Sequence, residues 1–229
     1  MSLKYSKEKK KLKKALKLDP TNFELLIELG FFYYEFQRYR KAIKIYNKAL
    51  KLNSNDSELW YLLGCLYEDK GEYRNALDKY MNAHRINKED PVILNAVANI
   101  YIKLNAIEWA TSTYKIILFF YPGLNGSLEA LSDLLSERGK YKEAIKFCKR
   151  AVEYNNMNPF NWLQLGKVYH SEGDYEKAII SYKKALEIYP ENVEVLNHLR
   201  KAYVEIGRND LALSTLFSEF LIHKKRQQL

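Results

Sequence analysis

Residues 162–190, WLQLGKVYHSEGDYEKAIISYKKALEIYP, decide the fold of this chain. The first half places apolar or small side chains at the i, i+3, i+4 and i+7 spacing of one helix face, at Trp162, Leu165, Gly166 and Tyr169. Gly173 follows, at a place where a helix must end and turn. The second half again shows a helical apolar face, at Ala178, Tyr182 and Ala185. The stretch therefore predicts two helices joined by a tight turn.

This helical hairpin recurs along the chain with a period of 34 residues. Six of the 16 alanines stand at that spacing, at Ala42, Ala76, Ala110, Ala144, Ala178 and Ala212. Twelve residues before each alanine the sequence carries Gly30, Gly64, Ala98, Ser132, Gly166 and, as the exception, Arg200. We expect these small residues to face the alanines, so that the two backbones approach closely while a tyrosine fills the space beside them. One such hairpin cannot bury its apolar face alone, so the hairpins must stack into a solenoid.

The pattern W-x-x-L-G-x-x-Y, followed by G-x-Y-x-x-A-x-x-x-Y-x-x-A and a late proline, resembles the tetratricopeptide repeat. The resemblance covers most of the chain and implies an all-α fold, a right-handed α-solenoid of tandem helix-turn-helix repeats. It predicts one superhelical domain over residues 23–222. Its six repeats are expected to start near Phe23, Ser57, Pro91, Asn125, Pro159 and Val193.

The two ends depart from the repeat. Residues 1–22 match only the second helix of a repeat and predict a lysine-rich half-repeat helix, and residues 223–229 predict a basic tail. Solenoids usually end in polar capping elements. The sequence favours an excised segment of a longer array, and the alternative is a complete small protein with an atypical N-terminal cap.

The net charge of +9 comes from the ends of the chain. Residues 1–17 hold eight Lys and one Glu, whereas residues 18–222 hold 26 basic and 27 acidic residues. The terminal lysines could contact nucleic acid or acidic lipid, but a solvated helix face or a frayed tail is the preferred interpretation. A nucleic-acid partner is disfavoured because the central part of the chain is neutral.

The sequence contains no constellation of residues for catalysis. It has no Gly-rich phosphate loop, no HExxH motif and no nucleophile elbow, and its four histidines fall at spacings unsuited to a metal. Cys148 replaces the interior aromatic residue of its repeat and is predicted to be a small core side chain. We therefore expect a protein that is not an enzyme and that uses no cofactor or metal. Two cysteines make no disulfide framework, which favours the cytoplasm, and no apolar run is long enough for a transmembrane helix.

The resemblance implies that the first helices line a concave groove for a peptide or helix of a partner protein. The residues one step round from the buried face are expected to contact that partner, and we select Phe31, Tyr34, Tyr61, Cys65, Asn95, Asn99, Lys167, His170, Asn197 and Lys201. The strip begins aromatic, passes through amides and acids, and ends basic. The alternative is ordinary surface variation. The two-carboxylate clamp of some family members is absent, because Glu129 and Asp133 would repel a carboxylate.

A second contact surface is predicted on the outer face of the second helix of repeat 3. That face is polar in repeat 1, but in repeat 3 it carries Trp109, Ile116 and Phe119. Large apolar side chains exposed together mark contact surfaces, so we expect self-association or partner docking. The alternative is a distorted repeat that buries these side chains under a neighbour.

These observations support three hypotheses about function. The first is a non-enzymatic protein–protein interaction scaffold that binds its partner in the concave groove. The second is a regulatory or targeting segment of a larger enzyme or multi-domain protein. The third is an adaptor that binds nucleic acid or an anionic membrane through the terminal lysines. Because tetratricopeptide repeats serve many partners, the sequence names neither the partner nor the pathway.

Overall fold

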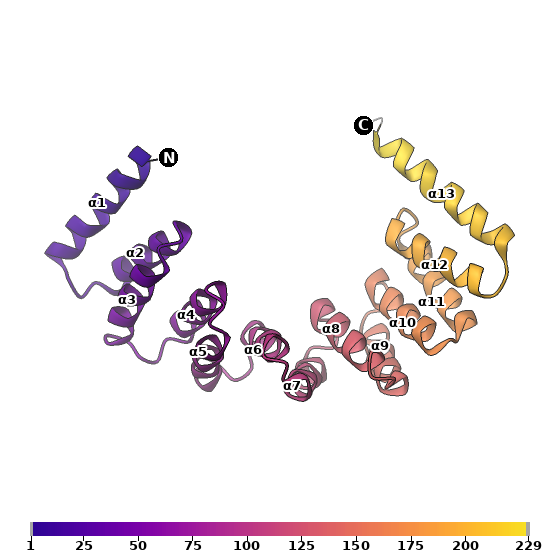
Figure 1. The fold of residues 1–229 in the computed structure, drawn as a ribbon, viewed down its shortest axis with the longest axis horizontal. Helices are drawn as coiled ribbons and strands as arrows, with labels where there is room; N and C mark the ends of the chain where they lie inside the picture. The colour runs from indigo at the N-terminus through magenta and orange to yellow at the C-terminus, as the bar shows by residue number, and fades with distance from the viewer. Residues whose placement is uncertain (1, 228–229) are drawn as a thin grey trace. The chain divides into compact units, whose positions relative to one another are not determined.

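The computed structural model describes residues 2–227, and these residues form 13 α-helices and no strand, which confirms the all-α prediction (Figure 1). The first seven helices are α1 (Ser2–Leu18), α2 (Phe23–Glu35), α3 (Tyr39–Leu50), α4 (Ser57–Asp69), α5 (Tyr73–Ile86), α6 (Pro91–Lys103) and α7 (Ile107–Phe120). The remaining six are α8 (Asn125–Ser136), α9 (Tyr141–Tyr154), α10 (Pro159–Glu172), α11 (Tyr175–Ile188), α12 (Val193–Glu205) and α13 (Asn209–Gln227). The last helix includes most of the segment predicted as a basic tail.

The helices form two compact units, Met1–Ala110 and Thr111–Leu229. In the first unit each helix from α1 to α6 packs against the next one along the chain, and in the second unit the same holds from α8 to α13. Both units are thus stacks of helical hairpins, which is the solenoid organisation that the sequence predicts. The single domain over residues 23–222 stays a prediction.

Most first helices of the hairpins begin at a polar capping residue. The side-chain oxygen of the capping residue accepts a hydrogen bond from a backbone N–H two or three residues further on, at Asn22, Asp56, Asp90, Asn158 and Asn192. These residues keep the 34-residue phase of the repeat. Repeat 4 carries Leu124 at this place and has no side-chain cap. Caps of this kind stabilise a helix by about 1 kcal/mol, so the start of α8 lacks a contribution that its counterparts have.

The turns within the hairpins need a left-handed backbone conformation. Gly71, Gly139, Gly173 and Gly207 supply it with positive φ values. Gln37 and Asn105 stand at the same repeat phase and also adopt positive φ, at 54° and 57°. The turn geometry is therefore kept in all six hairpins, although two of them use residues for which this conformation costs energy.

The close approach inside the hairpins involves a tyrosine ring. A Cβ atom built on Gly30, Gly64 or Gly166 would overlap the ring of a tyrosine from the second helix. The tyrosines concerned are Tyr46, Tyr80 and Tyr182, whose side chains are almost completely buried. Each glycine therefore makes room for the tyrosine ring, and the alanines of the repeat are buried as well. The direct contact between glycine and alanine stays a prediction.

Repeat 4 replaces both members of the glycine–tyrosine pair. Ser132 stands at the glycine position and Cys148 at the tyrosine position, and both side chains are buried. Burial raises the pKa of the Cys148 thiol to about 12. A larger residue on α8 is thus matched by a smaller one on α9, and Cys148 is an uncharged core side chain.

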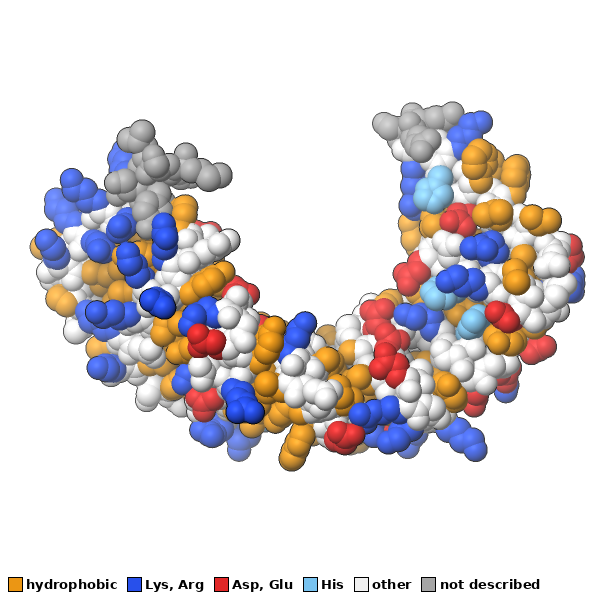
Figure 2. All heavy atoms as spheres, in the orientation of Figure 1, with side chains coloured by type: hydrophobic (Ala, Val, Ile, Leu, Met, Phe, Trp, Pro, Cys, Tyr) orange, Lys and Arg blue, Asp and Glu red, His pale blue; other side chains and the backbone are white. Residues whose placement is uncertain are grey.

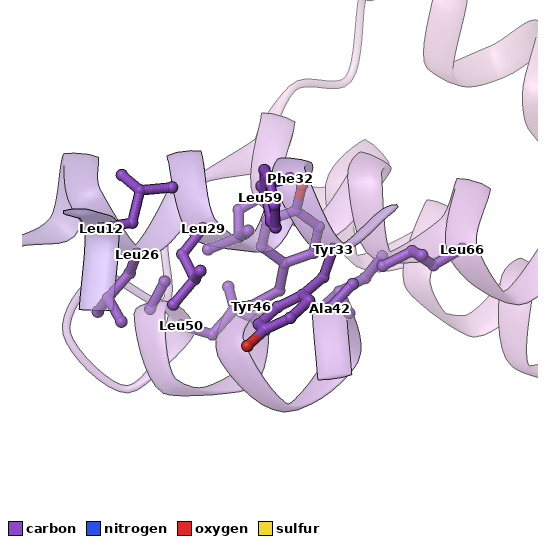
Figure 3. Packing of buried hydrophobic residues seen from close by; sticks show 12 residues of the cluster. Leu12, Leu26, Leu29, Phe32, Tyr33, Ala42, Tyr46, Leu50, Leu59 and Leu66 are labelled. Atoms are coloured by element: carbon purple, nitrogen blue, oxygen red, sulfur yellow. The ribbon is translucent and has the colours of Figure 1, made fainter. Parts of the chain in front are cut away.

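The core of the first unit begins with the half-repeat helix α1. Leu12 of α1 joins a buried cluster with Leu26 and Leu29 of α2 and Leu50 of α3 (Figure 3). Leu16 packs against the same cluster. Helix α1 therefore covers the apolar face that the first hairpin would otherwise expose to water.

Candidate binding surface

Four predicted contact residues of the first unit come from the first helices α2 and α4. Phe31 and Tyr34 lie one helical turn apart on α2 with their rings 6.5 Å apart, and Phe31 is 47% exposed. Tyr61 and Cys65 lie one turn apart on α4 and are half-buried. We call Phe31, Tyr34, Tyr61 and Cys65 the aromatic face.

Hydrogen bonds fix the polar atoms of the aromatic face. A hydrogen bond with Asp69 on α4 raises the pKa of Tyr34 on α2 and links the two helices. The Tyr80 hydroxyl donates to Glu68 Oε2 at 2.6 Å and lies 3.4 Å from Cys65 Sγ. Burial raises the pKa of the Cys65 thiol and raises the pKa of Tyr61 to about 12. These groups are uncharged near neutral pH, so the aromatic face offers apolar surface and fixed hydroxyl groups.

The corresponding residues of the second unit carry charges. Lys167 Nζ on α10 lies 3.3 Å from Glu129 Oε1 on α8. Burial raises the pKa of Asp133 on α8, and the charge of Lys167 opposes that shift. Acidic, basic and histidine side chains gather over α8, α10 and α12, where Figure 2 shows them in red, blue and pale blue. We call Glu129, Asp133, Lys167, His170, His198 and Lys201 the charged face.

Two histidines of the charged face are held neutral. Burial and, to a smaller extent, the charges of Lys167 and Lys201 lower the pKa of His198 to about 4. Its ring stacks on Tyr182 with the ring centroids 5.7 Å apart. Burial also lowers the pKa of His170, which packs edge-on against Tyr175. At neutral pH the cationic charge of this face therefore comes from the two lysines.

The neutral state of His198 predicts a specific pH dependence of stability. Between pH 6.5 and pH 4 the unfolded chain binds a proton at His198 before the folded chain does, so the free energy of unfolding must fall with falling pH. Because water reaches part of the His198 ring, we expect the free energy of unfolding to fall by about 1–2 kcal/mol, which is less than for a completely buried histidine. His198→Gln should lack this component, as urea titrations over that pH range would show. Parallel pH profiles for the two proteins would contradict it.

Two of the predicted asparagines, Asn197 and Asn95, donate hydrogen bonds to neighbouring groups of the protein. Asn197 donates its amide hydrogens to Glu219 Oε1 on α13 and to the Val193 carbonyl, at 3.0 and 3.2 Å. Asn95 donates to the Pro91 carbonyl at 2.7 Å, and the side chain of Asn99 is exposed. Asn197 thus joins α12 to α13, a structural contact that does not depend on a partner.

The apolar residues predicted on the outer face of α7 are all exposed. The exposed fractions of Trp109, Ile116 and Phe119 are 65%, 51% and 60%, and Phe120 beside them is 66% exposed. Trp109 stacks on Tyr101 with ring centroids 6.0 Å apart, and the guanidinium of Arg150 lies 5.1 Å from the Phe119 ring centroid. Self-association or partner docking through these residues stays a prediction.

The sequence analysis missed two residues that shape these faces. Asp69 is the acceptor that fixes Tyr34, and His198 lies among the lysines of the charged face. The repeat pattern did not single out His198, because the same repeat phase carries Glu28, Leu62, Ala96, Ala130 and Gln164 in the other repeats.

The described part of the chain offers neither a metal site nor a membrane-spanning helix. No group of three or more His, Cys, Asp or Glu side chains is placed to hold a metal ion there. Within the same residues no helix is both long and apolar enough to cross a bilayer.

Three family models match the chain, and all three describe tetratricopeptide repeats. A TPR repeat model matches residues 166–207, and a tetratricopeptide repeat model matches residues 9–64. Another tetratricopeptide repeat model matches residues 57–90 and 126–156. The matched segments lie in both units.

The chain is similar to parts of longer curated proteins. It is 28% identical over 111 residues to the protein CTR9 homolog of Arabidopsis thaliana, a match that covers 47% of this chain and 10% of that protein. It is 27% identical over 134 residues to the BBSome complex member BBS4 of Bos taurus, covering 44% of this chain and 26% of that protein. The matches thus span at most about a quarter of these relatives.

A solved structure shares the fold. The crystal structure of YrrB, described as a TPR protein with an unusual peptide-binding site, superposes with a TM-score of 0.59 at 20% sequence identity. The similarity covers 81% of this chain and 96% of that one.

Proposed function

Since the chain belongs to the tetratricopeptide repeat family, whose repeats indicate a protein–protein interaction scaffold, we propose that it binds a peptide or helix of a partner protein along the face of its first helices. In this proposal the protein is not itself an enzyme. The exposed ring of Phe31 within the aromatic face carries the proposal, because large aromatic side chains of this kind are the usual anchors of an interface.

The chemistry of the two faces suggests what each would bind. The aromatic face offers a half-exposed phenyl ring beside tyrosine hydroxyls that hydrogen bonds hold in place, which suits an apolar side chain flanked by backbone amides. The charged face offers Lys167 and Lys201 beside Glu129 and Asp133, which suits a segment with both signs of charge. The peptide-binding site named for YrrB supports the choice of a peptide ligand.

The test is a triple substitution of Phe31, Tyr34 and Tyr61 by alanine. A peptide is first selected on the wild-type chain from a displayed library and then titrated calorimetrically against both proteins. Each lost anchor should weaken binding by roughly 2 kcal/mol, about thirtyfold in Kd. A matched control replaces three exposed side chains elsewhere, Met157, Ile180 and Tyr189, by alanine and should bind normally. Unchanged affinity of the Phe31/Tyr34/Tyr61 variant, with intact helical circular dichroism, would exclude the aromatic face.

A second candidate function is supported by the length of the relatives. Both curated proteins extend far beyond the matched part, which covers 10% and 26% of them. The chain would then be the regulatory or targeting segment of a larger enzyme or multi-domain protein. Sequencing the complete open reading frame tests this second function. A reading frame that encodes no further domain would refute it.

A further inference from the structure

The net positive charge of this protein is concentrated in the segment that forms its first three helices. Residues 1–51 carry 14 Lys and Arg and five Asp and Glu, a net charge of +9, while the remaining residues carry 23 of each sign. The whole net charge of the chain thus lies in this segment. Figure 2 shows the blue side chains gathered over α1–α3, at the left of the molecule.

Helix α1 exposes lysines over most of its surface. Among the side chains of α1 that the structure describes, Leu12 and Leu16 form the apolar side, which packs against the core. The exposed lysines are Lys7, Lys10, Lys11, Lys13, Lys14 and Lys17. Five lysines of α1 line a shallow hollow of about 580 Å³, namely Lys9, Lys10, Lys13, Lys14 and Lys17.

A second row of lysines on α3 continues this surface. Lys41, Lys44, Lys48 and Lys51 are exposed at the spacing of one helix face. Lys48 Nζ donates to the carbonyl of Pro20 at 2.7 Å, and Pro20 lies in the loop that leaves α1 just after Lys17. This contact places the end of α3 beside the end of α1. We call Lys10, Lys13, Lys14 and Lys17 of α1, Lys44 and Lys48 of α3, and Lys51 directly after α3 the lysine surface.

The lysine surface lacks the counter-charges found elsewhere in the protein. Lysines of later helices form ion pairs, such as Lys115 with Glu143 at 2.6 Å and Lys184 with Glu187 at 2.7 Å. Within the described residues none of the lysine-surface side chains forms an ion pair. Lysines four residues apart on α1 repel one another and oppose helix formation. An anionic partner would remove this repulsion, so its binding and the helical state of α1 should stabilise each other.

Two exposed leucines distinguish between anionic partners. Leu18 is 84% exposed directly after Lys17, and Leu52 is 45% exposed directly after Lys51. Phosphodiester chains offer no favourable environment for leucine, and single-stranded nucleic acid is usually held by aromatic stacking as well as charge. The boundary of a bilayer accommodates both groups, because anionic head groups attract the lysines and the acyl region takes up the apolar side chains. We propose that the lysine surface binds an anionic lipid bilayer.

The test measures flotation of the full chain with vesicles of phosphatidylcholine, with and without phosphatidylserine. The chain should bind only the vesicles that contain phosphatidylserine, and binding should fall steeply as salt is raised. Each lysine near an anionic surface contributes about a fivefold gain in partitioning, so the variant Lys10→Gln, Lys13→Gln, Lys14→Gln should lose about a hundredfold. Leu18→Ser should weaken binding without changing its salt dependence.

A matched control removes the same charge elsewhere. The variant Lys142→Gln, Lys146→Gln, Lys149→Gln changes three exposed lysines of α9 and should bind the vesicles within a few-fold of wild type. Three results would overturn the proposal: equal binding to pure phosphatidylcholine, an equal loss in the control variant, or tighter binding to a single-stranded RNA oligonucleotide than to the vesicles. Peptide binding by the aromatic face uses other residues and should be unchanged in both lysine variants.

Discussion

Replacing Gly166 by leucine is expected to lower the free energy of unfolding by about 3 kcal/mol. A Cβ atom at this position already overlaps the ring of Tyr182, which is fully buried. A leucine must therefore push α10 and α11 apart. Because neighbouring hairpins stack on both helices, the damage should spread into α9 and α12.

Urea unfolding followed by circular dichroism measures this loss, and hydrogen exchange measures its spread along the chain. Gly126→Ala is the matched control, because Gly126 lies in helix α8 with open space where a Cβ would be. Alanine there should leave the stability unchanged or raise it by about 0.5 kcal/mol. Equal stability of the Gly166→Leu variant and the wild type would refute the packing described for the glycine–tyrosine pair.

Replacing Asn161 by alanine is expected to cost about 3 kcal/mol. Asn161 is completely buried in α10, and its amide donates to the carbonyls of Ala151 and Asn155, at 2.8 and 3.0 Å. These bonds hold the end of α9 and the loop that follows it. Alanine would remove both hydrogen bonds and leave a cavity. Calorimetric unfolding of the variant measures the loss.

The contrasting variant is Gln164→Leu, one turn further along the same helix. Gln164 is equally buried, but among the described residues it accepts a single long hydrogen bond, 3.4 Å from Ser132 Oγ, and its Nε2 atom finds no partner there. Leu62 stands at the same repeat phase in α4. The leucine variant should be as stable as wild type or more stable by about 1 kcal/mol. A larger loss of stability in Gln164→Leu than in Asn161→Ala would contradict the conclusion that the hydrogen bonds of Asn161 stabilise the fold more than that of Gln164.

The sequence was sufficient for the fold because the fold depends on local spacing. The 34-residue period of alanine, glycine and tyrosine reflects contacts within one hairpin, and such contacts repeat with the sequence. The sequence was less informative where different residue types can adopt the same backbone conformation. Gln37 and Asn105 adopt the left-handed turn that glycine adopts elsewhere, and a search for glycine does not find them.

The candidate surface was less predictable, because it depends on contacts between repeats. Helical spacing correctly indicated that Phe31 is exposed, but it could not show that Asp69 of the next repeat fixes Tyr34. Helical spacing also could not show that the Asn197 side chain donates a hydrogen bond to Glu219 of α13. The charge count favoured a solvated helix for the N-terminal lysines. It could not show the contact between Lys48 and Pro20, which joins these lysines to the row on α3.

The replacement of a tyrosine by Cys148 gives this protein an internal reporter. The sulfur atom is fully buried between α8 and α10, and its raised pKa keeps it protonated, so an alkylating reagent can reach it only when that part of the solenoid opens. Cys65 is only half-buried and should react more readily. The ratio of the two labelling rates therefore measures, in a single unmodified chain, how often the helices around Cys148 open locally.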